Sequence, residues 1–184
     1  MLDRTKIFFS LTLLFISVTS ISNASPEKFT TPSKAIISFH DYKDSKTFKT
    51  ISENPYHLQL SPIVVPNDTR KTIEKEVKRS LIYGVYRSFI HTDINEVTIT
   101  SVPLEINPKT RSYKQLNSYA VKITVSRSKA LMAVKETIGV NRFDQLVEDQ
   151  KIGDYLLRDS WAKIFDNVYY KEQGINLLVS KLRK

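Results

Sequence analysis

The sequence predicts an α+β fold, in which a small antiparallel sheet packs on a long central helix over residues 70–91 and additional helices follow towards the C-terminus. Three observations predict it. Residues 70–91 carry the longest helical pattern, the segments 97–106 and 119–125 alternate as strands do, and helical patterns predominate after residue 126.

The segment Arg70–His91 changes character along its length. In its first half, Ile73, Val77 and Leu81 recur every four residues among lysines, as in an amphipathic helix. In its second half the only charged side chain is Arg87, and apolar residues occupy every face. A helix that is apolar nearly all round must be covered on more than one side. We therefore expect the second half to be buried in the fold or covered by a partner.

The chain before this helix predicts short strands. Ala35–His40 is a short apolar run, and with Thr47–Ser52 it suggests a hairpin across a polar turn. Tyr56–Val65 alternates, but three prolines in and around it favour an edge strand or an extended covering strand. The run 67–69 (Asn-Asp-Thr) supplies side chains that can cap the helix.

After the helix, two strands are predicted to pair as an antiparallel hairpin. Val97–Ile106 and Tyr119–Val125 both alternate, and the polar segment 107–117 separates them. Pro103 indicates an edge position or a bulge in the first strand.

The C-terminal third predicts helices. Lys129–Ile138 has an apolar stripe and ends at Gly139, where a left-handed cap is expected. The pattern further predicts a short turn around Phe143, a loop over Glu148–Gly153, a helix over Asp159–Tyr170, and a last helix after a break at Gly174.

Residues 1–24 have the features of a secretory signal peptide. A basic start precedes an apolar core too short to span a bilayer, and Ala24 ends a small-residue cleavage motif. We expect export to the periplasm or beyond the cell. Residues 25–66 then form an N-terminal arm with short or edge strands, and residues 67–184 an α+β core, so that 25–184 is one globular domain.

Composition excludes several classes of function. The 184 residues include no cysteine, which excludes thiol catalysis, thiolate metal sites and disulfides. The formal net charge of +9 suits contact with an anionic surface, although a lysine-rich exterior also simply keeps a protein soluble.

Catalytic motifs are not found in the sequence. The three histidines lack metal-ligand spacing, and the four glycines form no phosphate-binding loop, so no cofactor is expected. An exported hydrolase or toxin would have to use His91, Asp93 or Glu105, and it needs these groups to converge in a cleft.

The leading hypothesis is an exported, non-enzymatic module that binds another envelope or secreted protein, for example in a secretion or conjugation assembly. The expected interface lies on the central helix, because tyrosine and arginine often anchor interfaces: Arg79, Tyr83, Tyr86, Arg87 and Ile90.

The alternative hypothesis is a polyanion binder that contacts nucleic acid or anionic lipid. A basic cluster with one aromatic side chain occupies the predicted loop between the two strands, and it consists of Lys109, Arg111, Tyr113 and Lys114. A solvated loop without a ligand would have the same composition.

Overall fold

The computed structural model describes residues 25–183 and confirms the α+β fold. The helices are α1 (Pro32–Ser38), α2 (Arg70–His91), α3 (Arg127–Ile138), α4 (Asp166–Tyr169) and α5 (Glu172–Arg183). The strands are β1 (Phe48–Glu53), β2 (Tyr56–Leu60), β3 (Ile63–Val64), β4 (Glu96–Ser101), β5 (Leu104–Asn107), β6 (Ser112–Gln115), β7 (Val121–Ser126), β8 (Val147–Ile152) and β9 (Tyr155–Trp161). Short 3-10 turns occupy Asn117–Tyr119, Phe143–Leu146 and Lys163–Phe165. The predicted signal peptide lies outside the described residues.

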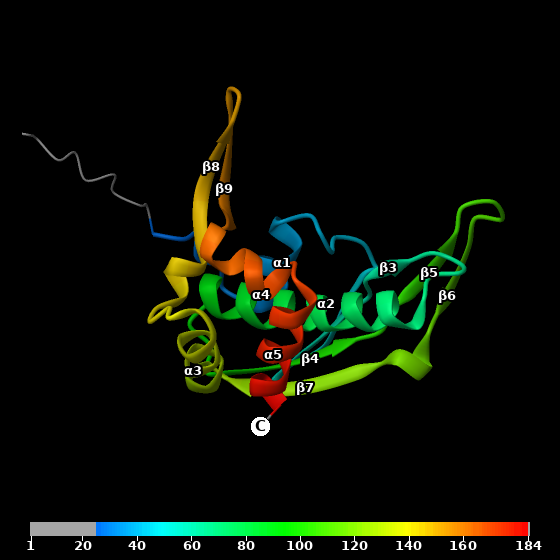
Figure 1. Ribbon diagram of the computed structural model, residues 1–184, viewed down its shortest axis with the longest axis horizontal. Helices are drawn as coiled ribbons and strands as arrows, with labels where there is room; N and C mark the ends of the chain where they lie inside the picture. The colour runs from blue at the N-terminus through cyan, green and yellow to red at the C-terminus, as the bar shows by residue number, and fades with distance from the viewer. Residues whose placement is uncertain (1–24, 184) are drawn as a thin grey trace, which may run out of the picture.

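The main sheet has the strand order β1-β2-β4-β7, and α2 packs against it (Figure 1). The pairs β1–β2 and β4–β7 are antiparallel, but β2 and β4 are parallel. The expectation of a purely antiparallel sheet is therefore wrong for this pair, since α2 forms the crossover between them. The expectation of an edge strand is also wrong for β2. Its prolines, Pro55 and Pro62, lie outside Tyr56–Leu60 and leave its ladder intact.

The long helix has the predicted bounds and is covered as its pattern required. Thr69 is its N-cap, and its hydroxyl accepts a hydrogen bond from the Thr72 amide at 3.2 Å. Every residue from Ser80 to His91 is buried. The sheet covers one side, while α1, α3 and α5 contact others. At the sheet the approach is close, because a Cβ on Gly84 would lie 2.9 Å from Ile99 Cγ2.

The predicted strand over 97–106 is two strands in different sheets. β4 pairs with β7, as predicted, but the chain leaves the main sheet at Val102–Pro103. β5 then joins a second sheet of order β3-β5-β6, whose β5–β6 hairpin extends from the body (Figure 1). Pro103 marks this change of sheet, because it cannot donate to a ladder.

The N-terminal hairpin prediction is wrong. Residues 35–38 belong to α1, which the Thr31 side chain caps by accepting a hydrogen bond from the Lys34 amide at 3.3 Å. The strand predicted at Thr47–Ser52 exists as β1, but it pairs with β2. A short apolar run cannot by itself distinguish a buried helical turn from a strand.

The C-terminal third is partly as predicted. α3 ends at Gly139, which has the expected left-handed conformation with a φ of 76°. The predicted loop over Glu148–Gly153 is wrong, because residues 147–161 form the antiparallel hairpin β8–β9. The predicted helix at Asp159–Tyr170 is correspondingly shortened to a 3-10 turn and α4. Gly174 lies inside α5 rather than at a break.

Candidate functional site

The interface predicted on α2 is not available to a partner. Tyr83 and Tyr86 are fully buried, and Ile90 and Arg87 are nearly so. The Tyr86 hydroxyl donates to the Ala130 carbonyl of α3 at 3.0 Å, so α3 already occupies that face. The sequence-based expectation is corrected for these residues, because elements of the same chain cover the apolar circumference. Of the predicted set, Arg79 alone stays half-exposed.

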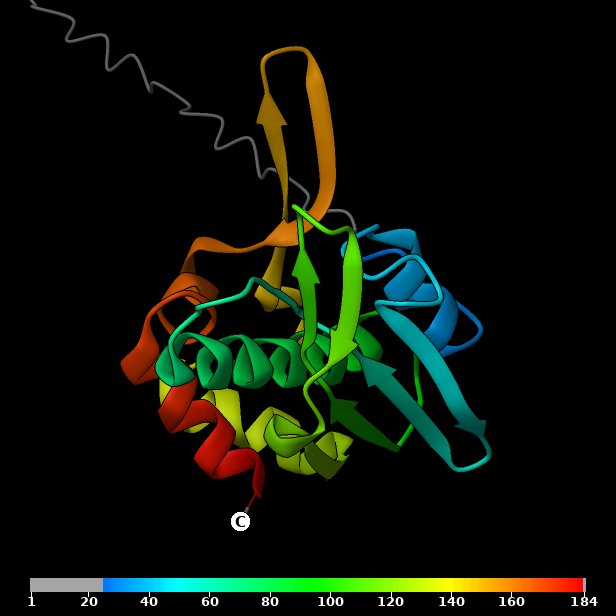
Figure 2. The ribbon, with the colours of Figure 1, turned by 90° about the vertical axis from the view of Figure 1, so that its right-hand side faces the viewer.

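A different feature, the β8–β9 hairpin, projects from the body in both views (Figures 1 and 2). Its turn is Gly153-Asp154, since Ile152 pairs with Tyr155. Gly153 has a φ of +59°, a conformation that glycine adopts without strain in two-residue hairpin turns. This Gly-Asp pair between two apolar residues was the sequence signal that could have identified the hairpin.

Large apolar side chains at the hairpin tip are exposed to solvent. Tyr155 is 79% exposed, Ile152 59%, Leu156 54% and Leu157 47%. Ile152 pairs with Tyr155 across the turn, and Leu157 follows on the same face of β9, whereas Leu156 points to the opposite face. The exposed apolar side chains therefore lie close together on both faces of the hairpin tip. We call these four residues the tip patch. Contiguous apolar surface on an exposed element is typical of an interaction site.

The base of the hairpin is fixed in the core. Trp161 is buried at the end of β9, with its ring centroid 4.8 Å from that of Phe165 and 5.1 Å from that of Tyr169. At the start of β8, Val147 is buried opposite it. The base of the hairpin is therefore fixed to the core, and the tip extends from that attachment.

Arg87 links this base to the N-terminal part of the chain. Its guanidinium carbon lies 3.8 Å from the Phe39 ring centroid and 4.0 Å from that of Trp161, so the cation is sandwiched between α1 and β9. Nη1 donates to the Asp159 carbonyl at 2.7 Å. Asp159 has a φ of 50°, beside a register shift in the hairpin that turns this carbonyl inward.

His91 completes the same cluster in its neutral form. Its Nδ1–H donates to the Glu27 carbonyl at 2.8 Å, which leaves Nε2 to accept from Arg87 Nη1 at 3.3 Å. Burial lowers the pKa of His91 to about 4. The Asp159 carboxylate is 3.9 Å from Nδ1 and accepts from the Glu27 amide, and burial raises its pKa.

A hollow of about 990 Å³ lies at the base of the hairpin. It is bounded by the end of α1, by α2, by β9 and by α4. Its walls combine arginines, aspartates and aromatic rings, and Leu156 and Leu157 of the tip patch also line it. We call this hollow the basal groove. The groove and the tip patch are continuous, and together they are the candidate site.

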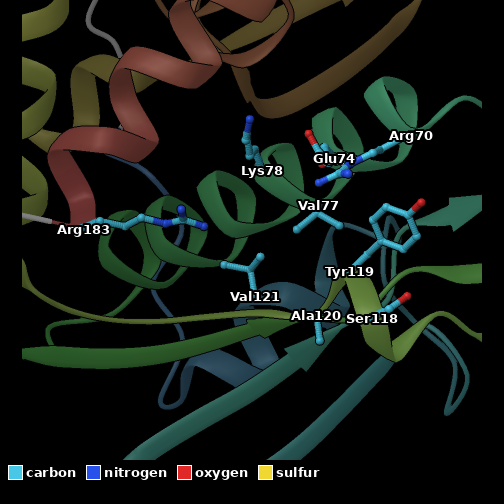
Figure 3. A pocket seen from close by; sticks show the side chains of 9 residues that line it. All are labelled: Arg70, Glu74, Val77, Lys78, Ser118, Tyr119, Ala120, Val121 and Arg183. Atoms are coloured by element: carbon cyan, nitrogen blue, oxygen red, sulfur yellow. Dashed lines mark hydrogen bonds and ion pairs between the residues drawn. The ribbon is translucent and has the colours of Figure 1, made fainter.

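A second hollow, of about 510 Å³, lies between α2, β7 and the turn before β7 (Figure 3). Two of its cations are already engaged. Arg70 Nε donates to Glu74 at 2.7 Å, and Lys78 Nζ donates to Asn176 at 2.8 Å. These two cations are therefore paired within the protein rather than directed at a ligand.

The basic cluster of the alternative hypothesis is divided by strand alternation. Lys109 and Arg111 lie in the β5–β6 turn, while neighbouring Tyr113 and Lys114 point to opposite faces of β6. Lys114 is paired across the strands with Glu105, so an opposite charge faces it. The structure adds one cation that sequence reasoning missed, since Lys46 Nζ lies 3.7 Å from the Tyr113 ring centroid.

The three side chains proposed for catalysis, His91, Asp93 and Glu105, do not converge in one cleft. The Asp93 carboxylate accepts a hydrogen bond from Lys28 Nζ at 2.9 Å, rather than one from His91. Glu105 lies on β5 of the second sheet, whereas His91 is at the end of α2. Within residues 25–183 no group of three or more histidines and acidic residues could hold a metal ion. None of the helices in this range is both long and apolar enough to cross a membrane.

Comparison with known proteins gives no relatives. No protein-family model matches the chain, and neither a curated protein nor a solved structure matches it. The functional argument therefore rests on the residues themselves.

Proposed function

We propose that the protein is an exported module that binds another envelope or secreted protein through the β8–β9 hairpin. The observation that carries this proposal is the exposure of the tip patch on an element whose base is rigidly fixed. The predicted signal peptide supports the proposal that the protein is exported. Burial of a solvent-exposed tyrosine, isoleucine and two leucines would supply a partner with the kind of apolar anchor that dominates interface energies.

The hairpin also offers backbone hydrogen bonds to a partner. It forms a two-stranded sheet of its own, β8–β9, within the described chain. An isolated two-stranded hairpin is marginally stable in water, and its unpaired strand edges are templates for another strand. A partner that covers the tip patch would therefore stabilise the hairpin as well as bury its side chains.

We expect Leu157→Glu to abolish partner binding without unfolding the protein. The side chain is exposed, so a charge there costs the fold about 0.5 kcal/mol or less, while it places an unpaired carboxylate in the interface. Tagged protein is purified from the envelope of the organism that encodes it, and the retained proteins are quantified by mass spectrometry. The partner should be reduced at least about tenfold, as expected for an interface residue worth 1.4 kcal/mol or more.

The matched control is Leu177→Glu. Leu177 on α5 has the same exposed fraction as Leu157, 47%, and lies outside the hairpin. It should retain the partner at the wild-type level. Equal retention by both variants would contradict a role for the hairpin.

The second candidate is the polyanion binder, and the observation that favours it is the contact of Lys46 with Tyr113. It takes second place because Lys114 faces Glu105. Retention of nucleic acid or anionic lipid in the same purification, lost steeply with salt, would favour it over the protein-binding proposal.

A further inference from the structure

The basal groove contains a buried cation that the protein itself pairs incompletely. Arg87 is only 4% exposed, yet it lines the groove. The hydrogen bonds described for its guanidinium are both made by Nη1, to a carbonyl and to a neutral imidazole. Its Nε is buried and has no hydrogen-bond partner among the described residues. A buried cation without a hydrogen-bonded anion is costly, so a carboxylate that accepted a hydrogen bond from Arg87 would lower that cost.

The surroundings hold this guanidinium in one orientation. Phe39 and Trp161 stack on it from two sides, and the Asp159 carbonyl fixes one nitrogen. A planar donor set that is already fixed loses little conformational entropy when it binds a carboxylate. Arg87 is therefore organised for binding before any ligand arrives.

A second arginine, Arg79, lines the same groove about two turns before Arg87 on α2. Arg79 is half-exposed, and its guanidinium carbon lies 5.8 Å from the Tyr169 ring centroid. It forms an ion pair with Glu76 at 2.9 Å, which leaves other guanidinium donors for a ligand. The two arginines are eight positions apart on one helix, so they lie along a single face.

The acidic residues of the groove restrict the ligand to a compact one. Asp41 and Asp166 also line it, so the groove is not uniformly positive. The Asp159 carboxylate is engaged by the Glu27 amide at 3.0 Å. A polyanion would meet several of these carboxylates at once, so a ligand with a single carboxylate fits the groove better. Leu156 and Leu157, also in the lining, provide apolar contact next to that position.

We propose that the basal groove receives an acidic side chain from a peptide segment of the partner, bound by Arg87 and Arg79 while flanking apolar side chains pack on the tip patch. This inference rests on the proposed function and names the chemistry of the segment that the hairpin binds.

The test uses propionate, which has the carboxylate of a glutamate side chain. The purified exported protein is titrated to about 100 mM and followed by NMR at the Trp161 indole N–H and the Arg87 Nε–H, because one such contact gives only millimolar affinity. Trp161 is the single tryptophan, so its signal is unambiguous. Both signals should shift and saturate. Propionamide, the neutral isostere, and chloride at equal ionic strength should not produce these shifts.

Variants on α2 separate a site from a general charge effect. Arg79→Gln should weaken propionate binding about tenfold, the loss expected for one charge-assisted hydrogen bond. Lys75→Gln removes the same charge from the same helix at a residue that does not line the groove, and it should leave the titration unchanged. Arg87→Lys keeps the charge but loses the planar donors, and it should abolish saturation.

Three results would overturn the inference. These are an absence of saturable shifts with propionate, equal shifts with propionamide, and equal weakening by Arg79→Gln and Lys75→Gln. The Leu157→Glu purification is independent of all three. If it loses the partner while propionate has no effect, the carboxylate site fails and the proposed function stands. If propionate binds but Leu157→Glu keeps the partner, the proposed function fails.

Discussion

Gly174→Ala is expected to destabilise the fold by about 3 kcal/mol, although the same change in an ordinary helix stabilises it by about 1 kcal/mol. A Cβ at this position would lie 1.9 Å from the Asn167 carbonyl oxygen and 2.9 Å from Val168 Cα. Both atoms belong to the backbone of α4, which cannot rotate away as a side chain could. α5 would have to move, and its buried face (Ile175, Leu178, Val179 and Leu182) would separate from the core.

The measurement is the free energy of unfolding from denaturant titration. Gln173→Ala, at the preceding exposed position of α5, is the control and should change stability by about 0.5 kcal/mol or less. A Gly174→Ala variant as stable as the wild type, or more so, would show that α4 and α5 do not approach this closely.

Acidification from about pH 6.5 to pH 4 is expected to remove about 3 kcal/mol of stability through His91. The folded protein holds this imidazole neutral, with its pKa lowered to about 4 by burial. The unfolded chain binds the proton near its ordinary pKa, about 6.5. Below that pH the unfolded state therefore takes up more protons, and stability falls until the folded imidazole is also protonated near pH 4.

Asp159 acts in the opposite direction. Burial raises its folded pKa, so protonation of its carboxyl favours the folded state as the pH falls and offsets part of the loss. Unfolding titrations at several pH values measure the sum. His91→Asn keeps a donor for the Glu27 carbonyl but removes the titrating ring, so its stability should not fall between pH 6.5 and pH 5 as the wild type's does. An identical pH profile for the variant would exclude His91 as the cause.

Local signals in the sequence were sufficient for the elements that local interactions determine. The bounds of α2 follow from its cap at Thr69 and its periodicity, and the end of α3 follows from Gly139. The antiparallel pairing of β4 with β7 follows from alternation in both strands. Each of these depends on residues close together in the chain.

The buried interface shows where local reasoning fails. The apolar pattern of α2 correctly predicted that the helix is covered on several sides. It did not show whether a partner or other elements of the same chain cover it. Tyr83 lies 6.0 Å from Trp161 and Tyr86 5.4 Å from Phe165, measured between ring centroids. These partners are about 80 residues away in the chain, so only the tertiary fold reveals that the tyrosines are internal.

The hairpin was missed because a stronger pattern overlapped it. Trp161, Phe165 and Tyr169 recur every four residues, which predicts a continuous helix. In the fold, Trp161 ends β9, Phe165 ends a 3-10 turn and Tyr169 ends α4, yet all three rings meet in one cluster. Tertiary packing of aromatic rings produced the spacing, and the shorter Gly153-Asp154 turn signal was the correct one.

Photo-cross-linking at the hairpin tip tests the central claim most directly. A benzophenone amino acid replaces Tyr155 and, in a matched control, Tyr113 on the β5–β6 hairpin, which is also exposed. After irradiation in intact cells of the source organism, position 155 should yield a covalent adduct with one defined protein, and position 113 should not. An absence of adducts at 155, or the same adducts from both positions, would contradict the account.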